Sequence, residues 1–363
     1  MMWTIVAGPM HDPAEETATL FGHVGGRFQK AINRVGAVEH DICLAGQRLR
    51  LEFAGLALVD RILPALSHRL VDPQTNDGEA DLRISIWDGA STGIGAPTMP
   101  WTLDRFSSRR EVTGANSSDY CVAYDLYCGI LSIVSRRERR AYWWISDSRK
   151  LPAYEDAAPL REILQAWFTW RGGILIHAAA VGTDAGSVVL VGRGGVGKTT
   201  TALACVSANL RLLGEDYCLM TGFEEGALPR VHSLFSSAKL TDHSLGMLRH
   251  LEPFVVNADR RQADEKFLLM LHPGVPTQSE AALKAIILPR RVAGGRMSLA
   301  PASAKEALMA LAPSTILQLS GMAQDALHKM KRAVESVPAY RLEPGSRPQD
   351  VACTFRKLIA DAP

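Results

Sequence analysis

The feature that most constrains this chain is a glycine-rich segment that separates an apolar run from a segment with helical character. The apolar run is Ser187–Val191 (SVVLV), and the next residues are Gly192-Arg193-Gly194-Gly195-Val196-Gly197-Lys198-Thr199. They fit the pattern GxxxxGK[ST] at every fixed position, which is typical of loops that bind nucleotide phosphates. The order of apolar strand, glycine-rich loop and helix, with a further strand after it, predicts an α/β nucleotide-binding unit.

The residue types in this segment suit phosphate binding. Glycines let the backbone approach an anion closely, and the first N–H groups of a helix lack intrahelical partners. Lys198 can bridge β- and γ-phosphates, and the Thr199 hydroxyl can ligate Mg²⁺. We therefore predict that Gly192–Thr199 and the following Thr200 bind ATP and Mg²⁺. The alternative is a glycine-rich turn that carries a solvated lysine.

Two adjacent acids, Glu215 and Asp216, follow in a segment expected to be one strand, Arg211–Met220 (RLLGEDYCLM). Phosphoryl transfer needs a metal holder and a proton acceptor, and two carboxylates near the loop could fill both roles. We expect Asp216 to hold Mg²⁺ together with Thr199, while either acid could accept a hydroxyl proton. The alternative is a solvated pair at the end of a strand.

One histidine, His177, lies in the apolar segment Ile174–Val181 (ILIHAAAV), which we expect to form one strand. A lone histidine on an apolar strand is more often a structural residue than a catalytic one. Its position ahead of the glycine-rich loop and the acids makes it a catalytic candidate, together with Lys198, Glu215 and Asp216. It could orient an acid or contact a phosphate.

Basic residues beyond the loop could offset the charge of a transferred phosphoryl group. Lys239 and Lys266 are the candidates, and the alternative is that each pairs with an acid at the surface, such as Asp242 or Glu265. The basic pairs at 260–261 and 290–291 could meet an acidic peptide or only solvate a loop.

The length of 363 residues predicts two domains, since single domains average roughly 150 residues. We place the boundary near residue 150. Residues 1–150 are expected to be an α+β domain for substrate recognition or assembly, and residues 151–363 the nucleotide-binding domain. The expected elements are strands at 45–56, Leu82–Trp87, Tyr142–Ile145, Ala281–Pro289 and Ala339–Leu342, and helices at Ala57–Leu70, Pro159–Trp170, 198–209, Ser303–Leu311, Gly321–Ser336 and Pro348–Ala360.

Composition excludes several other classes of protein. Forty basic residues nearly balance 38 acidic ones, so no nucleic acid or anionic membrane is expected as a partner. The N-terminus lacks the features of a secretory signal, and the longest uncharged stretch, Ala307–Gln324, is too polar to span a bilayer. The six cysteines show no metal-binding or disulfide spacing. We expect a soluble, cytoplasmic protein.

Three segments together resemble one known family. They are HAAAV at 177–181, VVLVGRGGVGKTTTAL at 188–203 and RLLGEDY at 211–217. In this order they are similar to the HPr kinase/phosphorylase family, and within it to serine kinases found beside peptide-modifying genes, including those that phosphorylate lasso-peptide precursors. The resemblance covers roughly residues 170–240. It implies a fold of the HPr kinase/phosphoenolpyruvate carboxykinase type and transfer of the γ-phosphoryl group of ATP to a serine hydroxyl of a peptide or small protein.

The resemblance assigns roles to the loop, His177 and the acid pair, and it also shows two departures. The family usually has two aspartates where this chain has Glu215 and Asp216, so which acid is the base stays open. The family's phosphorylase motif is missing, which favours a kinase without phosphorylase activity. Two alternatives remain, a P-loop ATPase that acts as a switch or assembly protein and a small-molecule kinase. The sequence also leaves a homo-oligomer open.

Overall fold

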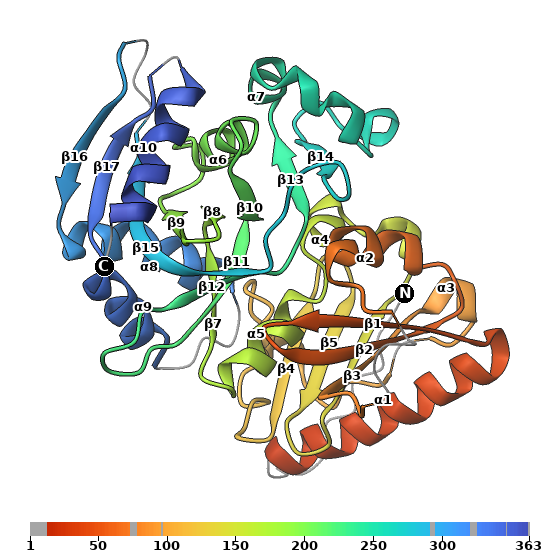
Figure 1. The fold of residues 1–363 in the computed structure, drawn as a ribbon. Coiled ribbons are helices and arrows are strands. Elements are labelled where there is room, and N and C mark those ends of the chain that lie inside the picture. Colours follow the sequence, from red (N-terminus) through yellow and green to blue (C-terminus); the bar gives the residue numbers. More distant parts are fainter. Residues whose placement is uncertain are drawn as a thin grey trace. The chain divides into compact units, whose positions relative to one another are not determined.

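The computed structural model of the protein describes residues 13–72, 78–95, 97–290, 295–319, 325–345 and 347–361, and it is a mixed α/β structure (Figure 1). The chain forms two compact units. The first unit comprises the residues up to Leu63, residues Leu70–Trp170 and Leu319. The second comprises Pro64–Arg69, Arg171–Gln318 and the described residues after 324. The units therefore part at Trp170, later in the chain than the boundary expected near 150.

The first unit is built on a mixed sheet. In the described part of the chain this sheet has six strands in the order β1-β2-β3-β6-β5-β4. Strand β3 pairs in parallel with β2 and β6, and the remaining pairs are antiparallel. Strands β2, β3 and β6 lie where strands were predicted. The six strands are β1 (Ala37–Leu44), β2 (Gln47–Ala54), β3 (Leu82–Asp88), β4 (Tyr120–Asp125), β5 (Ile130–Ser135) and β6 (Arg140–Ile145).

A long helix that the sequence analysis missed, α1 (Pro13–Val35), packs on this sheet (Figure 1). Its buried Phe21 and Phe28 pack against Tyr142 of β6. Gly25 faces the same tyrosine, and a Cβ there would lie 2.6 Å from the Tyr142 hydroxyl. Glycine at position 25 therefore lets α1 approach Tyr142 of β6 closely. The other helices that begin in this unit are α2 (Val59–Leu66), α3 (Gly89–Thr92), α4 (Ala153–Ala157) and α5 (Arg161–Thr169).

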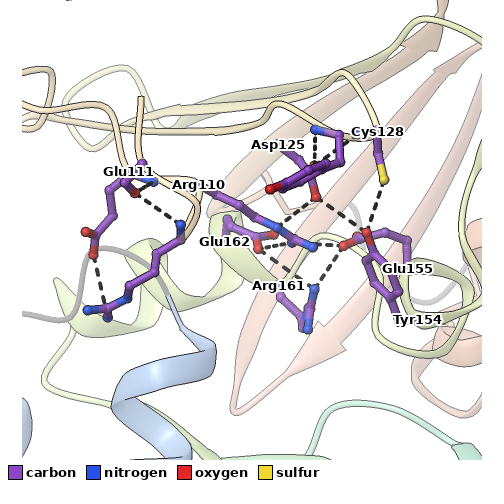
Figure 2. Close-up of polar contacts among 11 residues, drawn as sticks. Arg110, Glu111, Asp125, Cys128, Tyr154, Glu155, Arg161 and Glu162 are labelled. Carbon is purple, nitrogen blue, oxygen red and sulfur yellow. Dashed lines mark hydrogen bonds and ion pairs between the residues drawn. The ribbon is translucent and has the colours of Figure 1, made fainter. Parts of the chain in front are cut away.

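A buried cluster of charges joins α4 and α5 to the first sheet (Figure 2). The guanidinium of Arg110 contacts three carboxylates, with distances of 3.0 Å to Asp125 and 2.9 Å to Glu155, and it also hydrogen-bonds Glu162. Arg161 contacts Glu155 at 2.9 Å. Burial and the nearby Glu162 raise the pKa of Glu155, although both arginines oppose this. We call this group the Arg110 cluster.

The second unit has a larger mixed sheet. In the described residues it comprises nine strands, seven in the order β10-β8-β9-β15-β12-β11-β7, with β17 pairing with β15 and β16 with β17. A separate antiparallel pair consists of β13 and β14. The strands are β7 (Ile174–His177), β8 (Ala179–Thr183), β9 (Gly186–Leu190), β10 (Arg211–Gly214), β11 (Tyr217–Thr221), β12 (Arg230–Ser233), β13 (Ser237–Leu240), β14 (Phe267–Met270), β15 (Glu280–Pro289), β16 (Ser298–Ala302) and β17 (Ala339–Glu343).

Helices cover both faces of the larger sheet (Figure 1). Alternate residues of β9 belong to different cores: Val188 packs with α6 and α10, whereas Val189 packs with α8 and α9. Such alternation is expected for a strand buried on both faces. The helices of this unit are α6 (Lys198–Val206), α7 (Asp242–Met247), α8 (Ala304–Gln318), α9 (Asp325–Ser336) and α10 (Pro348–Asp361).

Two predictions of continuous strands are wrong. The expected strand at Ile174–Val181 divides at Ala178 into β7, which pairs with β11, and β8, which pairs with β9 and β10. The expected strand at Arg211–Met220 divides at 215–216 into β10 and β11. The two divisions lie together, because the Ala178 N–H donates to the Asp216 carbonyl at 3.1 Å. An uninterrupted apolar run cannot reveal such a change of pairing partner.

The remaining expected elements of the second unit are present, with shifted ends. Strand β15 and strand β17 lie where strands were predicted, and α10 matches the last predicted helix. Helix α6 ends at Val206, earlier than expected, and α8 continues to Gln318, well past the expected end at Leu311. The first four residues of the helix expected at 321–336 lie outside the described residues. None of the helices in the described ranges combines the length and apolar character needed to cross a membrane.

Candidate active site

The glycine-rich segment connects β9 to α6, as the sequence predicts, and the helix begins at Lys198. The backbone φ angles of Gly195 and Gly197 are 84° and 104°, values in the left-handed region that side chains disfavour. A Cβ at Gly195 would meet no atom within 4 Å, so the open space beside it is accessible to a ligand. The first turn of α6 therefore follows a loop whose backbone is exposed.

Lys198 is held at the start of α6 with only 7% of its surface exposed. Its ammonium group donates to the carbonyl oxygens of Gly192, at 2.7 Å, and Arg193, at 3.4 Å. Burial lowers the pKa of Lys198, while the charges of Asp216 and Glu215 oppose that shift. The hydrogen bonds of the ammonium to described residues thus use main-chain oxygens, and its charge remains available to an anion.

Glu215 lies directly against the start of α6. The Thr199 hydroxyl donates to Oε1 of Glu215, and the Lys239 main-chain N–H donates to Oε2 at 3.2 Å. The residue is only 5% exposed. Burial, and then the charge of Asp216, raise the pKa of Glu215 to about 7. A carboxyl with this pKa changes its charge near neutral pH.

Asp216 is held by two donors and is more exposed, at 20% of its side chain. Nε2 of His177 lies 2.9 Å from Oδ1, and the Lys239 ammonium lies 2.7 Å from Oδ2. Burial alone would raise the pKa of Asp216, but Lys239 and His177 lower it well below its usual value. The side chain is therefore ionised, which means that His177 carries a proton on Nε2.

The pairing of β7 with β11 explains how His177 reaches the acid pair. His177 and Tyr217 are direct partners in the antiparallel register, and Asp216 immediately precedes Tyr217. The His177 main-chain N–H donates to the Thr315 hydroxyl at 3.1 Å. Its Nδ1 is buried and has no hydrogen-bond partner among the described residues. The ring is thus fixed by its backbone and by a single side-chain bond to Asp216.

The structure brings most of the expected site residues to one cavity of about 400 Å³. The predicted residues that line it, all in the second unit, are His177, Gly194, Gly195, Gly197, Lys198, Thr199, Thr200, Glu215, Asp216, Lys239 and Lys266. Gly192, Arg193 and Val196 were also expected to bind the cofactor but do not line this cavity. The cavity therefore unites the glycine-rich loop, the acid pair and both candidate lysines.

The basic residues expected outside the loop have different surroundings, and Lys239 and Lys266 are the ones that line this cavity. Lys239 pairs with Asp216, and not with Asp242 as the surface alternative would require. Arg261 pairs with Asp242 at 2.9 Å and lies over the ring of Phe267. Arg260 is not among the lining residues, and Arg291 lies outside the described residues.

Several lining residues were missed by the sequence analysis, because they come from distant parts of the chain. Thr241 caps α7 by accepting a hydrogen bond from the Ser244 N–H at 3.2 Å, and Ser244 also receives the Thr200 hydroxyl at 3.0 Å. The sequence TDHS, a threonine before a short helix, is a capping signal that could have located this turn. Gln318 accepts from the Tyr217 hydroxyl at 2.7 Å, and no local pattern marks it.

No protein-family model matches the chain, and a search of curated proteins finds no significant match.

The donors at the start of α6 are suited to magnesium. The hydroxyl of Thr199 and the carboxylate of Glu215 are hard oxygen ligands, and they already touch each other. No group of three or more histidine, cysteine or acidic side chains in the described ranges forms a metal cage. Magnesium usually takes one or two carboxylates and completes its coordination with water and substrate phosphates. The residues present fit a metal that is bound together with a nucleotide.

Proposed function

We propose that this protein is an ATP- and Mg²⁺-dependent phosphotransferase that acts on a serine hydroxyl of a peptide or small protein. The observation that carries the proposal is the single cavity that contains Lys198, the Thr199–Glu215 contact and the Asp216–His177–Lys239 group. A phosphate-binding loop alone would fit any nucleotide-binding protein. Transfer to an acceptor also needs a group that orients the acceptor hydroxyl. Asp216, held by His177 and Lys239, could do this.

The loop would bind the phosphates of the nucleotide. Backbone N–H groups at the start of α6 face the anion, and the ammonium of Lys198 would contact the β- and γ-phosphates. The lysine would exchange the carbonyl of Gly192 for phosphate oxygens, which bear far more negative charge. It would also offset the charge that develops on the transferred group, the main task of a protein in phosphoryl transfer.

The two acids would have different roles, set by their burial and contacts. Glu215 is the more buried and contacts Thr199, so we assign Glu215 and Thr199 to Mg²⁺. When bound there, Mg²⁺ would supply positive charge that offsets the negative charge of the phosphates. In this proposal Glu215 takes the place of Asp216, the acid that the sequence analysis expected to hold the metal.

Asp216 would meet the acceptor. It is the more exposed of the two acids, and its carboxylate is ionised. A free lone pair on either oxygen can accept the hydrogen bond of a serine hydroxyl, which orients the oxygen for in-line attack. His177 and Lys239 hold the carboxylate in place. In a loose transition state the proton leaves the hydroxyl late, so orientation matters more than the basicity of the carboxylate.

Two further points support a kinase. The resemblance to HPr kinase/phosphorylase and to serine kinases of peptide-modifying gene groups rests on the same segments that line the cavity. Lys239 and Lys266 add positive charge at the site, which suits a polyanionic substrate. The glutamate in place of the family's first aspartate has one more methylene, and it reaches Thr199 in this structure.

The test is phosphopeptide formation. The full-length protein is incubated with ATP, Mg²⁺ and serine-bearing peptides encoded beside its gene, with an HPr-like protein as a second acceptor. Mass spectrometry should show the gain of one phosphate, and the matching Ser→Ala peptide should gain none. Asp216→Asn should retain ATP binding and lose about a hundredfold or more in transfer rate.

Two results would contradict the proposal. Steady ATP hydrolysis without any phosphorylated peptide would favour an ATPase switch. Phosphorylation of a metabolite, with peptides and HPr-like proteins unmodified, would favour a small-molecule kinase.

A further inference from the structure

Helix α8 reaches the cavity of the proposed active site through its last residue, Gln318. This side chain is the carboxamide among the lining residues, whose other polar side chains are charged groups, hydroxyls and two histidines. Phosphates, metal and the acceptor hydroxyl are already matched to the charged side chains and to Thr199. Gln318 lines the same cavity and has no partner in the proposed reaction.

Gln318 lies on the side of the cavity that carries Asp216. Tyr217 follows Asp216 in the chain, and its hydroxyl donates to Oε1 of Gln318 at 2.7 Å. The ring centroids of Tyr217 and His177 are 5.6 Å apart, and His177 bonds to Asp216. Gln318 is therefore connected through Tyr217 to the group that would meet the acceptor.

The end of α8 is fixed at two points to the strands of the site. The buried Thr315 hydroxyl accepts the main-chain N–H of His177, in β7, at 3.1 Å. One turn later, Gln318 accepts from Tyr217, in β11, whose residue is only 3% exposed. A side chain that is anchored in this way can orient a ligand, because its position is set before the ligand binds.

The two ends of the Gln318 carboxamide have different surroundings. Oε1 is bonded to a buried hydroxyl, whereas Nε2 has no hydrogen-bond partner among the residues that the structure describes. The residue is exposed and lines the cavity, so its two N–H donors are available to a ligand. An uncharged donor suits an uncharged acceptor such as a peptide carbonyl, whereas the cationic lysines suit phosphate oxygens.

We propose that Nε2 of Gln318 donates to a main-chain carbonyl of the acceptor peptide beside its serine, and so places the serine hydroxyl at Asp216. The inference rests on the proposed function and adds to it a residue that determines specificity. A small alcohol has no peptide carbonyl and would lose this contact. Gln318 would therefore favour a serine within a peptide over a small-molecule acceptor.

The experiment measures the steady-state kinetics of the full-length protein with ATP, Mg²⁺ and a serine-bearing peptide that the wild type phosphorylates. Gln318→Met removes the N–H donors with little change in size. We expect the KM for the peptide to rise about tenfold, the loss expected for one or two hydrogen bonds. The KM for ATP should change less than twofold and kcat less than about threefold. Gln29→Met, at an exposed position of α1, is the matched control.

Two further variants separate the donors from their anchor. Gln318→Glu keeps an oxygen that accepts from Tyr217 but lacks the N–H donors, so it should also raise the KM for the peptide. Tyr217→Phe removes the anchor of the carboxamide and should raise this KM by a few fold. In the Gln318→Met background, Tyr217→Phe should have no additional effect on it, because the two residues act through one contact.

The carbonyl is tested with peptides in which one of the two peptide bonds that flank the serine is replaced by a carbon–carbon double bond. This replacement keeps the planar geometry and removes the carbonyl oxygen. For one of the two analogues, the wild-type protein should show a KM about tenfold higher than for the parent peptide. Gln318→Met should show the same KM for that analogue and for the parent peptide.

The outcomes separate this inference from the proposed function. If the wild type forms phosphopeptide and both Gln318 variants keep the wild-type KM for the peptide, the inference alone fails. Equal rises in the KM for ATP and for the peptide would also overturn it, because they indicate a general disturbance of the site. If the wild type phosphorylates no peptide, the proposed function fails and the inference fails with it.

Discussion

Each unit buries a group of charged side chains, and the two groups differ in how their charges are neutralised. In the Arg110 cluster, one guanidinium contacts three carboxylates, so each positive group has negative partners within the cluster (Figure 2). In the second unit, the ammonium of Lys198 bonds to main-chain oxygens and faces a cavity. Buried charge alone therefore does not identify a site. A charge whose partners are weak, and which borders open space, is available for a ligand.

Removing Lys198 should abolish phosphoryl transfer at the proposed site in the second unit. Lys198→Ala deletes the point charge that would contact the terminal phosphates, which is worth several kcal/mol in the transition state. We expect phosphoryl transfer to fall by at least about a thousandfold, with a melting temperature close to wild type because the residue faces the ligand. Lys331→Ala, on the exposed surface of α9, is the matched control. Near-normal turnover in Lys198→Ala would remove the basis of the proposed site.

Removing Arg110 should lower the stability of the first unit. Arg110→Met leaves Asp125, Glu155 and Glu162 buried with one fewer positive partner, and a broken buried ion pair costs about 3–5 kcal/mol. Denaturant unfolding of the first unit should show a loss of this size. Arg149→Met is the control, since this arginine is 81% exposed and its ion pair with Asp147 should contribute little to stability. Equal stability of the two variants would mean that the cluster does not hold the unit together.

The pH dependence of metal binding should distinguish the role of Glu215 from that of Asp216. Glu215 has its pKa raised to about 7, so in the free protein it is protonated below that pH and must lose its proton to bind Mg²⁺. The affinity for Mg²⁺ and ATP should rise by up to about tenfold per pH unit as pH increases towards 7, and should level off above it. Glu215→Gln should bind more weakly and lack this part of the profile.

Asp216→Asn is the control for the same titration. Its pKa is lowered, so it is ionised throughout this range. Without its charge Glu215 should still titrate, but with its midpoint at a lower pH, because the charge of Asp216 helps to raise the Glu215 pKa. Protonation of the nucleotide itself is common to all three proteins and cancels in the comparison. If Asp216→Asn abolished the pH dependence and Glu215→Gln retained it, the two roles would be exchanged.

The sequence predicts the elements of this fold where its pattern is local. The glycine-rich loop between β9 and α6 follows from one motif, and β3, β6 and β15 follow from apolar runs with clear ends. Helix α1 was missed because three glycines, at 22, 25 and 26, interrupt an otherwise helical pattern. One of them is there for close packing against Tyr142, which only the folded sheet provides.

The site itself could be predicted only in part. The loop, the acids and His177 lie within a short stretch of sequence, and their types pointed to phosphate chemistry. Their pairing did not follow, because the contact between Thr199 and Glu215 depends on the division of one expected strand into β10 and β11. Gln318 reaches the cavity from the end of α8, and its role depends on tertiary packing alone.

The segment Pro64–Arg69 has a consequence for the synthesis of this protein. It belongs to the second unit, where the Ala65 carbonyl accepts from the Ser236 N–H at 2.8 Å and His68 lies 2.8 Å from the Ser233 hydroxyl. On the ribosome these six residues emerge long before their partners, and they must wait for residues 233–236 to be translated. A gene fusion that starts at Arg171 would leave the Ser236 N–H without its acceptor. Exchange of the second unit between proteins therefore needs two cuts near residues 63 and 70, as well as one near 170.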